Sequence, residues 1–294
     1  MQTMMTNTYG AIDMGSNAIR LLICNAFTHE DGVQYKVVNL MRVPIRLGED
    51  VFTEGRIPVD KQMALLDLMK GFYYMMKAYK VEAYRACGTS AMREAENGSE
   101  VAELIKHECG VNIEIISGEE EADLIFSSGM HEVITPEGNY LYVDVGGGST
   151  EISVIYNGNR VVSRSFRIGT VRMLKEAVAE DTLSELQEWL EAIAKQYAPS
   201  CILGSGGNIN RVRKILDDKS IQYQDLKELY NSVTSMTIDE RILKFGLNPY
   251  RADVIEYALK IFITVMKYAK VNQLQVPKLG LVDGIVRQLY NKAK

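Results

Sequence analysis

The feature that most constrains the fold of this chain is a pattern of elements that occurs twice. In each half, two apolar strand-like runs enclose a loop rich in small residues, and a turn then leads to a third strand. The loops run from Asp13 to Asn17 and from Asp144 to Ser149, and the turns are Asp31-Gly32 and Asn157-Gly158. Aligning Asp13 with Asp144 places Gly15 opposite Gly146, which supports a duplicated unit.

The two halves continue in the same order. Helical periodicity over residues 59–79 and over residues 184–197 leads to a short strand and a second loop of small residues. The first half then ends with a strand and a helix that opens at Gly118, and the second with one long, buried-looking helix over residues 250–269 and a final helix. This order predicts two similar α/β domains, and such duplicated folds usually bind their ligand in the cleft between the halves.

A length of 294 residues allows two domains. We place the first over residues 1–125, with a final helix over about 282–294 that packs back on it, and the second over residues 126–281. No uninterrupted apolar run is long enough to span a bilayer, and no signal segment precedes the first strand. We therefore expect a soluble, cytoplasmic protein without a membrane partner.

The charge and the cysteine content exclude some classes of function. A net charge of −5 argues against a general polyanion binder, so we expect no nucleic acid polymer as a partner, and phosphate binding would need a local site and a metal. The four cysteines form no CxxC pair and the three histidines are scattered, which argues against zinc.

Four loops of small residues occupy matching positions in the two halves. They contain Gly15, Ser16 and Asn17; Gly88, Thr89 and Ser90; Gly146, Gly147, Gly148, Ser149 and Thr150; and Gly206, Gly207 and Asn208. Any one of them is most simply a tight turn. Four at matching positions favour nests of backbone N–H groups that hold phosphate oxygens. The spacing fits neither a P-loop nor a Rossmann glycine motif.

Charged residues flank these loops. Asp13, Asp144 and Glu151 stand at strand ends, where their oxygens would suit Mg²⁺. Glu119, Glu120 and Glu121 open a helix, and dipole compensation alone would explain them, although three in a row leave room for one to act chemically. The arginines near the loops suit phosphate, but each alone is most simply a surface charge; they are Arg20, Arg46, Arg93, Arg167 and Arg172.

Eight stretches together resemble one known family. They are AIDMGSNAIRLLI, GTSAMREAEN, IISGEEEADLIFSSG, VDVGGGSTEISVI, FRIGTVRML, GSGGNINRV, YRADVI and GLVDGIV. In this order they are similar to the motifs of the exopolyphosphatase and guanosine-pentaphosphate phosphatase (Ppx/GppA) family. The resemblance covers nearly the whole chain, and its most specific part is the pair ISGEEEA and DVGGGSTE. It implies the duplicated α/β fold of actin, Hsp70 and sugar kinases, which is ribonuclease H-like in each half.

The resemblance also implies a mechanism, in which water attacks the terminal phosphoryl group of a phosphoanhydride chain with the help of a metal ion. Glu121 matches the family's catalytic glutamate, with the adjacent Glu120 as its rival. Asp144 and Glu151 would hold Mg²⁺ or another divalent cation, and Asp13 would complete the site from the other domain. The loop backbones would hold phosphates, that of Gly146 to Thr150 the terminal one, while Arg20, Arg46 and Arg93 would contact substrate.

Several alternatives stay open at this stage. Inorganic polyphosphate is the leading substrate, guanosine pentaphosphate is the second, and a weakly active regulator that binds nucleotide or polyphosphate is the third. A kinase is weaker, because kinases of this fold lack the SGEEEA run. Ala18 and Val282 depart from the family pattern, which often has serine and arginine there, and the second departure bears on substrate preference. We expect a short, two-domain member, with a homodimer as one candidate assembly.

Overall fold

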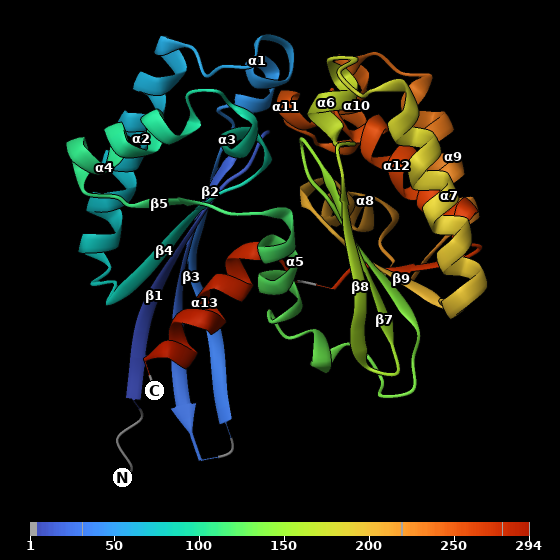
Figure 1. Cartoon of the computed structure of the whole chain (residues 1–294), viewed down its shortest axis with the longest axis horizontal. Coiled ribbons are helices and arrows are strands. Elements are labelled where there is room, and N and C mark those ends of the chain that lie inside the picture. The colour runs from blue at the N-terminus through green and yellow to red at the C-terminus, as the bar shows by residue number, and fades with distance from the viewer. Residues whose placement is uncertain (1–4, 31, 219, 278, 294) are drawn as a thin grey trace. The chain divides into compact units, whose positions relative to one another are not determined.

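The computed structural model describes residues 5–30, 32–218, 220–277 and 279–293 and divides the chain into two compact units (Figure 1). The first unit runs up to Ser128 and resumes at Gly280, and the second spans Gly129–Leu279. From the sequence we placed these boundaries near residues 125 and 282. Each unit has an apolar core of its own, and Phe72 in the first and Phe262 in the second are fully buried.

The first unit is built on one five-stranded mixed sheet. Its strands are β1 (Met5–Met14), β2 (Ile19–His29), β3 (Gly32–Val43), β4 (Ala83–Gly88) and β5 (Ile113–Ile115). The order is β3-β2-β1-β4-β5, with β1, β2 and β3 antiparallel neighbours and β1, β4 and β5 parallel ones. Of the predicted turn between β2 and β3, Asp31 lies outside the described residues.

Helices of the first unit cover this sheet. They are α1 (Leu47–Glu54), α2 (Val59–Ala78), α3 (Ser90–Glu94), α4 (Gly98–Cys109), α5 (Gly118–Phe126) and α13 (Leu281–Lys292). Although α13 comes from the end of the chain, it packs against β1 and α5 (Figure 1). A side chain at Gly284 would bring its Cβ to 1.9 Å from the Leu124 carbonyl oxygen, so glycine permits this close helix contact.

The second unit repeats this topology. Its strands are β6 (Tyr140–Val145), β7 (Thr150–Tyr156), β8 (Asn159–Phe166), β9 (Cys201–Ser205), β10 (Ser220–Gln222) and β11 (Gln273–Gln275). The order β8-β7-β6-β9-β11 matches that of the first sheet, and β10 pairs outside β11. The predicted Asn157-Gly158 turn is confirmed, with φ of 50° and 71°, as a two-residue hairpin loop requires. The duplicated α/β fold is therefore as predicted.

The helices of the second unit correct one expectation. They are α6 (Thr170–Leu174), α7 (Glu180–Tyr197), α8 (Gly207–Leu216), α9 (Tyr223–Thr234), α10 (Ile238–Phe245), α11 (Pro249–Ala252) and α12 (Ile255–Tyr268), with a 3₁₀ turn, η1 (Met130–Glu132), before β6. The single helix predicted over residues 250–269 is wrong, because it breaks after Ala252. The buried Arg241 guanidinium donates through Nη1 to the Ala252 carbonyl oxygen (3.0 Å), which a continuous helix would offer to a backbone N–H one turn later.

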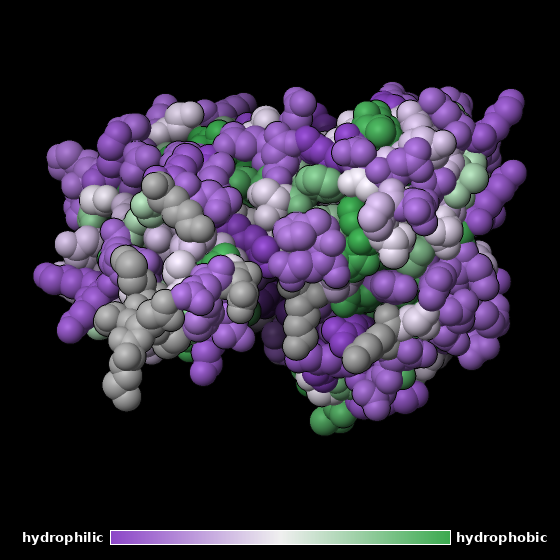
Figure 2. Space-filling view, turned by 90° about the horizontal axis from the view of Figure 1, so that it is seen from below, coloured by the Kyte–Doolittle hydropathy of each residue, from purple (hydrophilic) through white to green (hydrophobic). Residues whose placement is uncertain are grey.

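The face drawn in Figure 2 is mainly hydrophilic, and its apolar side chains gather only in small patches. Among the helices of the described ranges, none combines the length and the apolar character needed to cross a bilayer.

Candidate functional site

In each unit, the residues expected to bind ligand come together at one edge of the sheet. In the first unit Met14 is level with Gly88, and Gly88 with Ile115, so the loops that follow β1, β4 and β5 start side by side. In the second unit Asp144 is level with Ser205, which places the loops after β6 and β9 together. The carboxyl edge of parallel strands is where α/β folds of this kind bind their ligands.

The glycine loop of the second unit has its carbonyl groups held from one side. The Gly146 carbonyl accepts from the Thr170 N–H at 3.0 Å, and the Gly147 carbonyl from the N–H groups of the next two residues of α6 at 2.8 and 3.0 Å. The Gly148 carbonyl accepts from Arg172 Nε at 2.8 Å. Three successive peptide oxygens are therefore fixed by one short helix and its arginine.

The opposite side of the same peptides carries their N–H groups. In a trans peptide the C=O and the N–H point in opposite directions, so the N–H groups of Gly147, Gly148 and Ser149 are directed away from α6. No hydrogen bond among the described residues uses these three donors. We call them the N–H cradle. Converging backbone donors of this kind form an anion-binding nest.

Two residues hold the cradle that we did not assign to it from the sequence: Gly169 was given no role, and Arg172 was interpreted most simply as a surface charge, which is wrong. Arg172 is buried, and its side chain ends on the loop carbonyl rather than on the surface. Gly169 packs so closely that an added Cβ would lie 2.4 Å from the Gly147 carbonyl oxygen. The signal for both was the stretch FRIGTVRML, which we quoted for the resemblance without a function. Thr150, expected to bind phosphate, is fully buried and its hydroxyl donates to the Ile168 carbonyl at 2.6 Å.

The corresponding loop of the first unit is anchored to the start of α1. The Ser16 carbonyl accepts from the Gly48 N–H at 2.9 Å, and the Asn17 carbonyl from the Arg46 N–H at 3.2 Å. Arg46 adopts the left-handed conformation with φ of 57°, which is unfavourable for a residue with a side chain. Its buried guanidinium lies 3.0 Å from Glu49 Oε1. Arg46 therefore joins the loop to α1 through both its backbone and its charge.

The three candidate metal carboxylates lie in strands, whereas we placed Asp13 and Asp144 in loops. Asp13 lies in β1 opposite Arg20 of β2, and Arg20 Nη1 is 3.4 Å from Asp13 Oδ2. Burial raises the pKa of Asp13, and the charge of Arg20 partly opposes this rise. Asp144 lies in β6 opposite Glu151 of β7, so these two carboxylates share one face of the sheet.

The second unit's donor set suits a magnesium ion. Mg²⁺ in phosphate-processing sites is bound through one or two carboxylates, with substrate phosphates and water completing its shell. Asp144 and Glu151 supply such a pair, and Ser165 Oγ orients Glu151 Oε1 at 2.9 Å. Within the part of the chain that the structure describes, no group of three or more His, Cys, Asp or Glu side chains could hold a metal ion by itself. The set therefore fits a metal that a phosphate ligand would share.

The predicted loop of Gly206, Gly207 and Asn208 lies against Asp144 of this carboxylate pair. Gly206 has φ of 116°, and an added Cβ would lie 2.6 Å from the Val145 carbonyl oxygen and 3.4 Å from Asp144 Oδ1. Gly207 begins α8, and Asn208 in its first turn is buried. The start of α8 is thus directed to the end of β6 beside Asp144, where its N–H groups are available to an anion.

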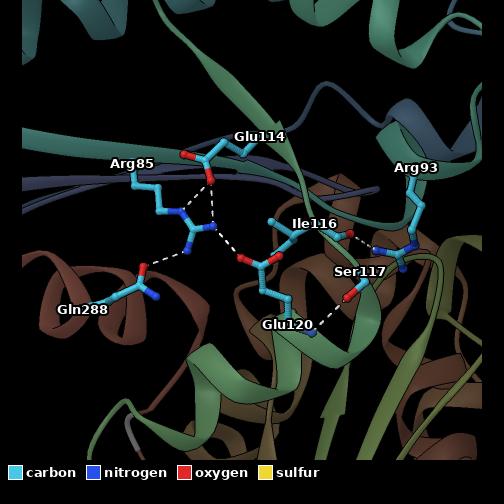
Figure 3. Close-up of polar contacts among 7 residues, drawn as sticks. All are labelled: Arg85, Arg93, Glu114, Ile116, Ser117, Glu120 and Gln288. Carbon is cyan, nitrogen blue, oxygen red and sulfur yellow. Dashed lines mark hydrogen bonds and ion pairs between the residues drawn. The ribbon is translucent and has the colours of Figure 1, made fainter.

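The three successive glutamates of α5 have different surroundings. Glu119 is exposed. Glu120 Oε1 lies 2.6 Å from Arg85 Nη2, and this ion pair belongs to the network of Figure 3. Glu121 is buried at 8% exposure, and its Oε2 lies 3.9 Å from Nη1 of Arg93. Of the two candidate bases, Glu120 is thus engaged by an arginine at short range, while Glu121 lies in a separate, buried environment beside Arg93.

Comparison with known proteins finds relatives that match nearly the whole chain. The chain is 25% identical to a guanosine-5'-triphosphate,3'-diphosphate pyrophosphatase of Aeromonas salmonicida, over 95% of this chain and 58% of the relative, so it spans little more than half of that protein's length. It is 22% identical to exopolyphosphatase 1 of Mycobacterium tuberculosis, over 97% of this chain and 89% of the relative.

Solved structures of related proteins share the fold of this chain. The Aquifex aeolicus member of the Ppx/GppA family superposes with a TM-score of 0.77 at 25% identity, covering 99% of both chains. An exopolyphosphatase from Cytophaga hutchinsonii shares the fold with a TM-score of 0.82 at 24% identity, covering 98% of this chain and 99% of that one. The model of the Ppx/GppA phosphatase family matches residues 27–293, and the chain belongs to that family.

Proposed function

We propose that this protein hydrolyses the terminal phosphoanhydride bond of inorganic polyphosphate in a metal-dependent reaction and releases orthophosphate. The observation that carries the proposal is the N–H cradle, because three successive peptides are fixed with their donors directed to one side. Such donors bind a phosphoryl group without contributing a charge that must first be desolvated. The cradle begins directly after the strand that holds Asp144.

The carboxylates supply the second requirement of phosphoryl transfer. A divalent cation at Asp144 and Glu151 would neutralise the charge on the phosphate oxygens. The cross-strand pairing keeps both side chains on one face, so the protein holds the negative charge for this purpose in a rigid ladder rather than in a loop. Phosphoryl transfer depends mainly on positioning and charge neutralisation, and these groups supply both.

Glu121 is our candidate for the residue that orients the attacking water and accepts its proton. It is buried in the first turn of α5, and Arg93 beside it donates through Nη1 to the Ile116 carbonyl at 2.7 Å, which fixes the guanidinium near the carboxylate. General-base assistance contributes about 10²- to 10⁴-fold to a rate.

Guanosine pentaphosphate is the second candidate substrate. The Aeromonas salmonicida relative carries the name of an enzyme for that nucleotide, while the Mycobacterium tuberculosis relative is named an exopolyphosphatase. Both substrates end in the same phosphoanhydride, so the cradle and the carboxylate pair would act on either.

Phosphate release from polyphosphate and from guanosine pentaphosphate, measured over a range of Mg²⁺ concentrations, tests the proposal. We expect release that a chelator abolishes, a large loss in Asp144→Ala, and a fall in kcat of about 10²- to 10⁴-fold in Glu121→Gln with substrate binding largely retained. Glu119→Gln, two residues before Glu121 and exposed, is the matched control and should equal the wild type. Full activity in excess chelator would contradict the proposed metal dependence. Tight binding of polyphosphate or nucleotide without phosphate release would instead indicate a regulator.

A further inference from the structure

Arg85 of β4 makes four hydrogen bonds that join three other elements (Figure 3). Its Nε and Nη2 donate to Glu114 Oε2 of β5 at 2.9 and 2.7 Å, and Nη2 also donates to Glu120 Oε1 of α5 at 2.6 Å. Its Nη1 donates to Gln288 Oε1 of α13 at 2.8 Å. The planar guanidinium suits such a fork of acceptors, and a lysine could not reproduce it.

The network lies at the surface on its carboxylate side, where the Glu114 and Glu120 side chains are 46% and 43% exposed, but its guanidinium is largely buried. The Arg85 side chain is 10% exposed; burial lowers the pKa of its guanidinium, but the hydrogen bonds that it donates to Glu114 and Glu120 raise this pKa overall. Exposed pairs contribute little because water screens them. The Arg85 guanidinium is largely removed from water and donates hydrogen bonds to residues of β5, α5 and α13, so it holds these three elements in one arrangement.

Only one of the bonded residues stands next to a residue of the proposed mechanism. Glu120 and Glu121 are successive residues in the first turn of α5, and successive side chains on a helix point about 100° apart. Fixing Glu120 therefore fixes the rotation of α5 about its own axis, and with it the direction of Glu121. Ser117 completes the anchor, because its Oγ accepts the Glu120 N–H at 3.1 Å.

A second arginine holds the other side of the same turn. Arg93 of α3 donates to the Ile116 carbonyl just before α5 (Figure 3). Its Nη1 also lies 3.9 Å from Glu121 Oε2. Arg85 and Arg93 belong to the continuous segment formed by β4 and α3, and they act on opposite sides of the first turn of α5.

We propose that Arg85 is a positioning residue for Glu121, which it orients through Glu120. This inference rests on the proposed function, since it concerns the orientation of the water-activating carboxylate. It gives Glu120 the role of an anchor rather than of a second general base. A displacement of about 1 Å in a catalytic group can cost about 10²-fold in rate, so an anchor of this kind has a measurable effect.

The test is a double-mutant cycle on kcat with Arg85→Gln, Glu120→Gln and the pair combined. We expect each single variant to lower kcat by about 10- to 10²-fold, with KM changed by less than about threefold. Because both residues act through one contact, the double variant should be little worse than either single one. Arg85→Lys should recover part of the loss, and Glu119→Gln should match the wild type.

Two outcomes would overturn the inference. One is an Arg85→Gln variant with wild-type kcat, and the other is a Glu120→Gln effect that persists in full when Arg85 is already replaced. Hydrogen exchange of the backbone amides of α5 provides a readout that needs no activity. We expect faster exchange there in Arg85→Gln, with α2 and α4 unchanged. If the wild type releases no phosphate, the proposed function fails, while this exchange result still tests whether Arg85 anchors α5.

Discussion

The loops at residues 15–18 and 146–149 share their length and their turn, but the strand residues that flank them differ in charge. An added Cβ at Gly15 and at Gly146 would lie at the same distance, 3.1 Å, from the carbonyl oxygen three residues later, so the two backbones follow nearly the same path. Opposite the strand carboxylate, however, the first unit has Arg20 and the second has Glu151. The backbone design is repeated, while the charge at one cross-strand position is reversed.

This charge difference indicates that only one of the two carboxylate positions is suited to bind a metal ion. The pair of Asp13 and Arg20 is neutral as a unit, so it needs no further charge. The pair of Asp144 and Glu151 places two like charges opposite each other, and like charges in that arrangement repel each other at a cost in free energy. A phosphate-bound metal ion would offset this cost, so the second unit is the better candidate for the metal.

The largest effect that would sharpen this comparison is expected at Gly169. In Gly169→Ala the new methyl group would meet the Gly147 backbone at 2.4 Å, and backbone cannot move aside. We expect phosphate release to fall about 10²-fold or more, as when a donor to a transition-state oxygen is lost.

The matched control is Gly48→Ala, which lies at the start of α1 in the first unit. Its nearest obstacle is the ring of Phe52, a side chain that can turn away. We expect a much smaller loss of activity there, measured in the same assay at equal protein stability. Equal losses in the two variants would mean that the two loops contribute alike.

A smaller effect is expected at Arg172, whose side chain holds the Gly148 carbonyl. Arg172→Lys keeps the charge but loses the rigid guanidinium, so the Ser149 N–H should be less well directed. Removing a charged hydrogen bond costs about 1.5–3 kcal/mol, which corresponds to roughly 10- to 10²-fold in kcat/KM. An unchanged kcat/KM would show that α6 alone holds the cradle.

Replacing the residue opposite the strand carboxylate should change the free energy of unfolding in opposite directions in the two units. Arg20→Gln leaves Asp13 buried without its cation, and we expect a loss of about 1–3 kcal/mol in the free energy of unfolding. Glu151→Gln removes a like charge opposite Asp144, and we expect a gain of about 0.2–1 kcal/mol in metal-free buffer. Thermal unfolding with and without Mg²⁺ measures both, and a loss in both variants without metal would contradict the comparison.

The last expected effect is a pH dependence of stability in the first unit, which carries a further carboxylate, Asp283, on α13. Burial raises its pKa from 3.8 to about 6, against the opposing charges of Arg287 and Arg20. The folded state therefore holds this proton more tightly than the unfolded state. Its contribution to stability is complete below pH 3.8 and is lost as the pH rises through 6.

Asp283→Asn should remove this dependence. The shift of about two pKa units corresponds to about 3 kcal/mol, so the variant should gain on the wild type by up to that amount between pH 4 and pH 7. Denaturant unfolding at several pH values measures the difference. Parallel pH profiles for the two proteins would show that Asp283 titrates alike in the folded and unfolded states.

Local patterns in the sequence were enough to predict much of the fold. Alternation and turn residues located the strands and the Asn157-Gly158 turn, and the acidic run after Ser117 located the start of α5. The resemblance supplied the family and the duplicated fold. These features depend on neighbours within a few residues, where periodicity and capping act.

The contacts that were missed join distant parts of the chain. Arg85 and Gln288 are 203 residues apart, and nothing near either one marks the pair. The break after Ala252 depends on Arg241 of α10, whose guanidinium donates a hydrogen bond to the Ala252 carbonyl at the end of α11. The strands also extend to include Asp13 and Asp144, because their ladder partners, and not their own propensities, decide where pairing ends.

The position of α13 has a consequence for the order of folding during synthesis. This helix packs on β1, yet it is made after the whole second unit of about 150 residues. At a synthesis rate of about 5–20 residues per second, the first sheet waits about 8–30 s for the helix that covers it. Until then the face of β1 that α13 covers is open to solvent and to other chains, so slow translation of the second unit would lengthen the period in which this protein can aggregate.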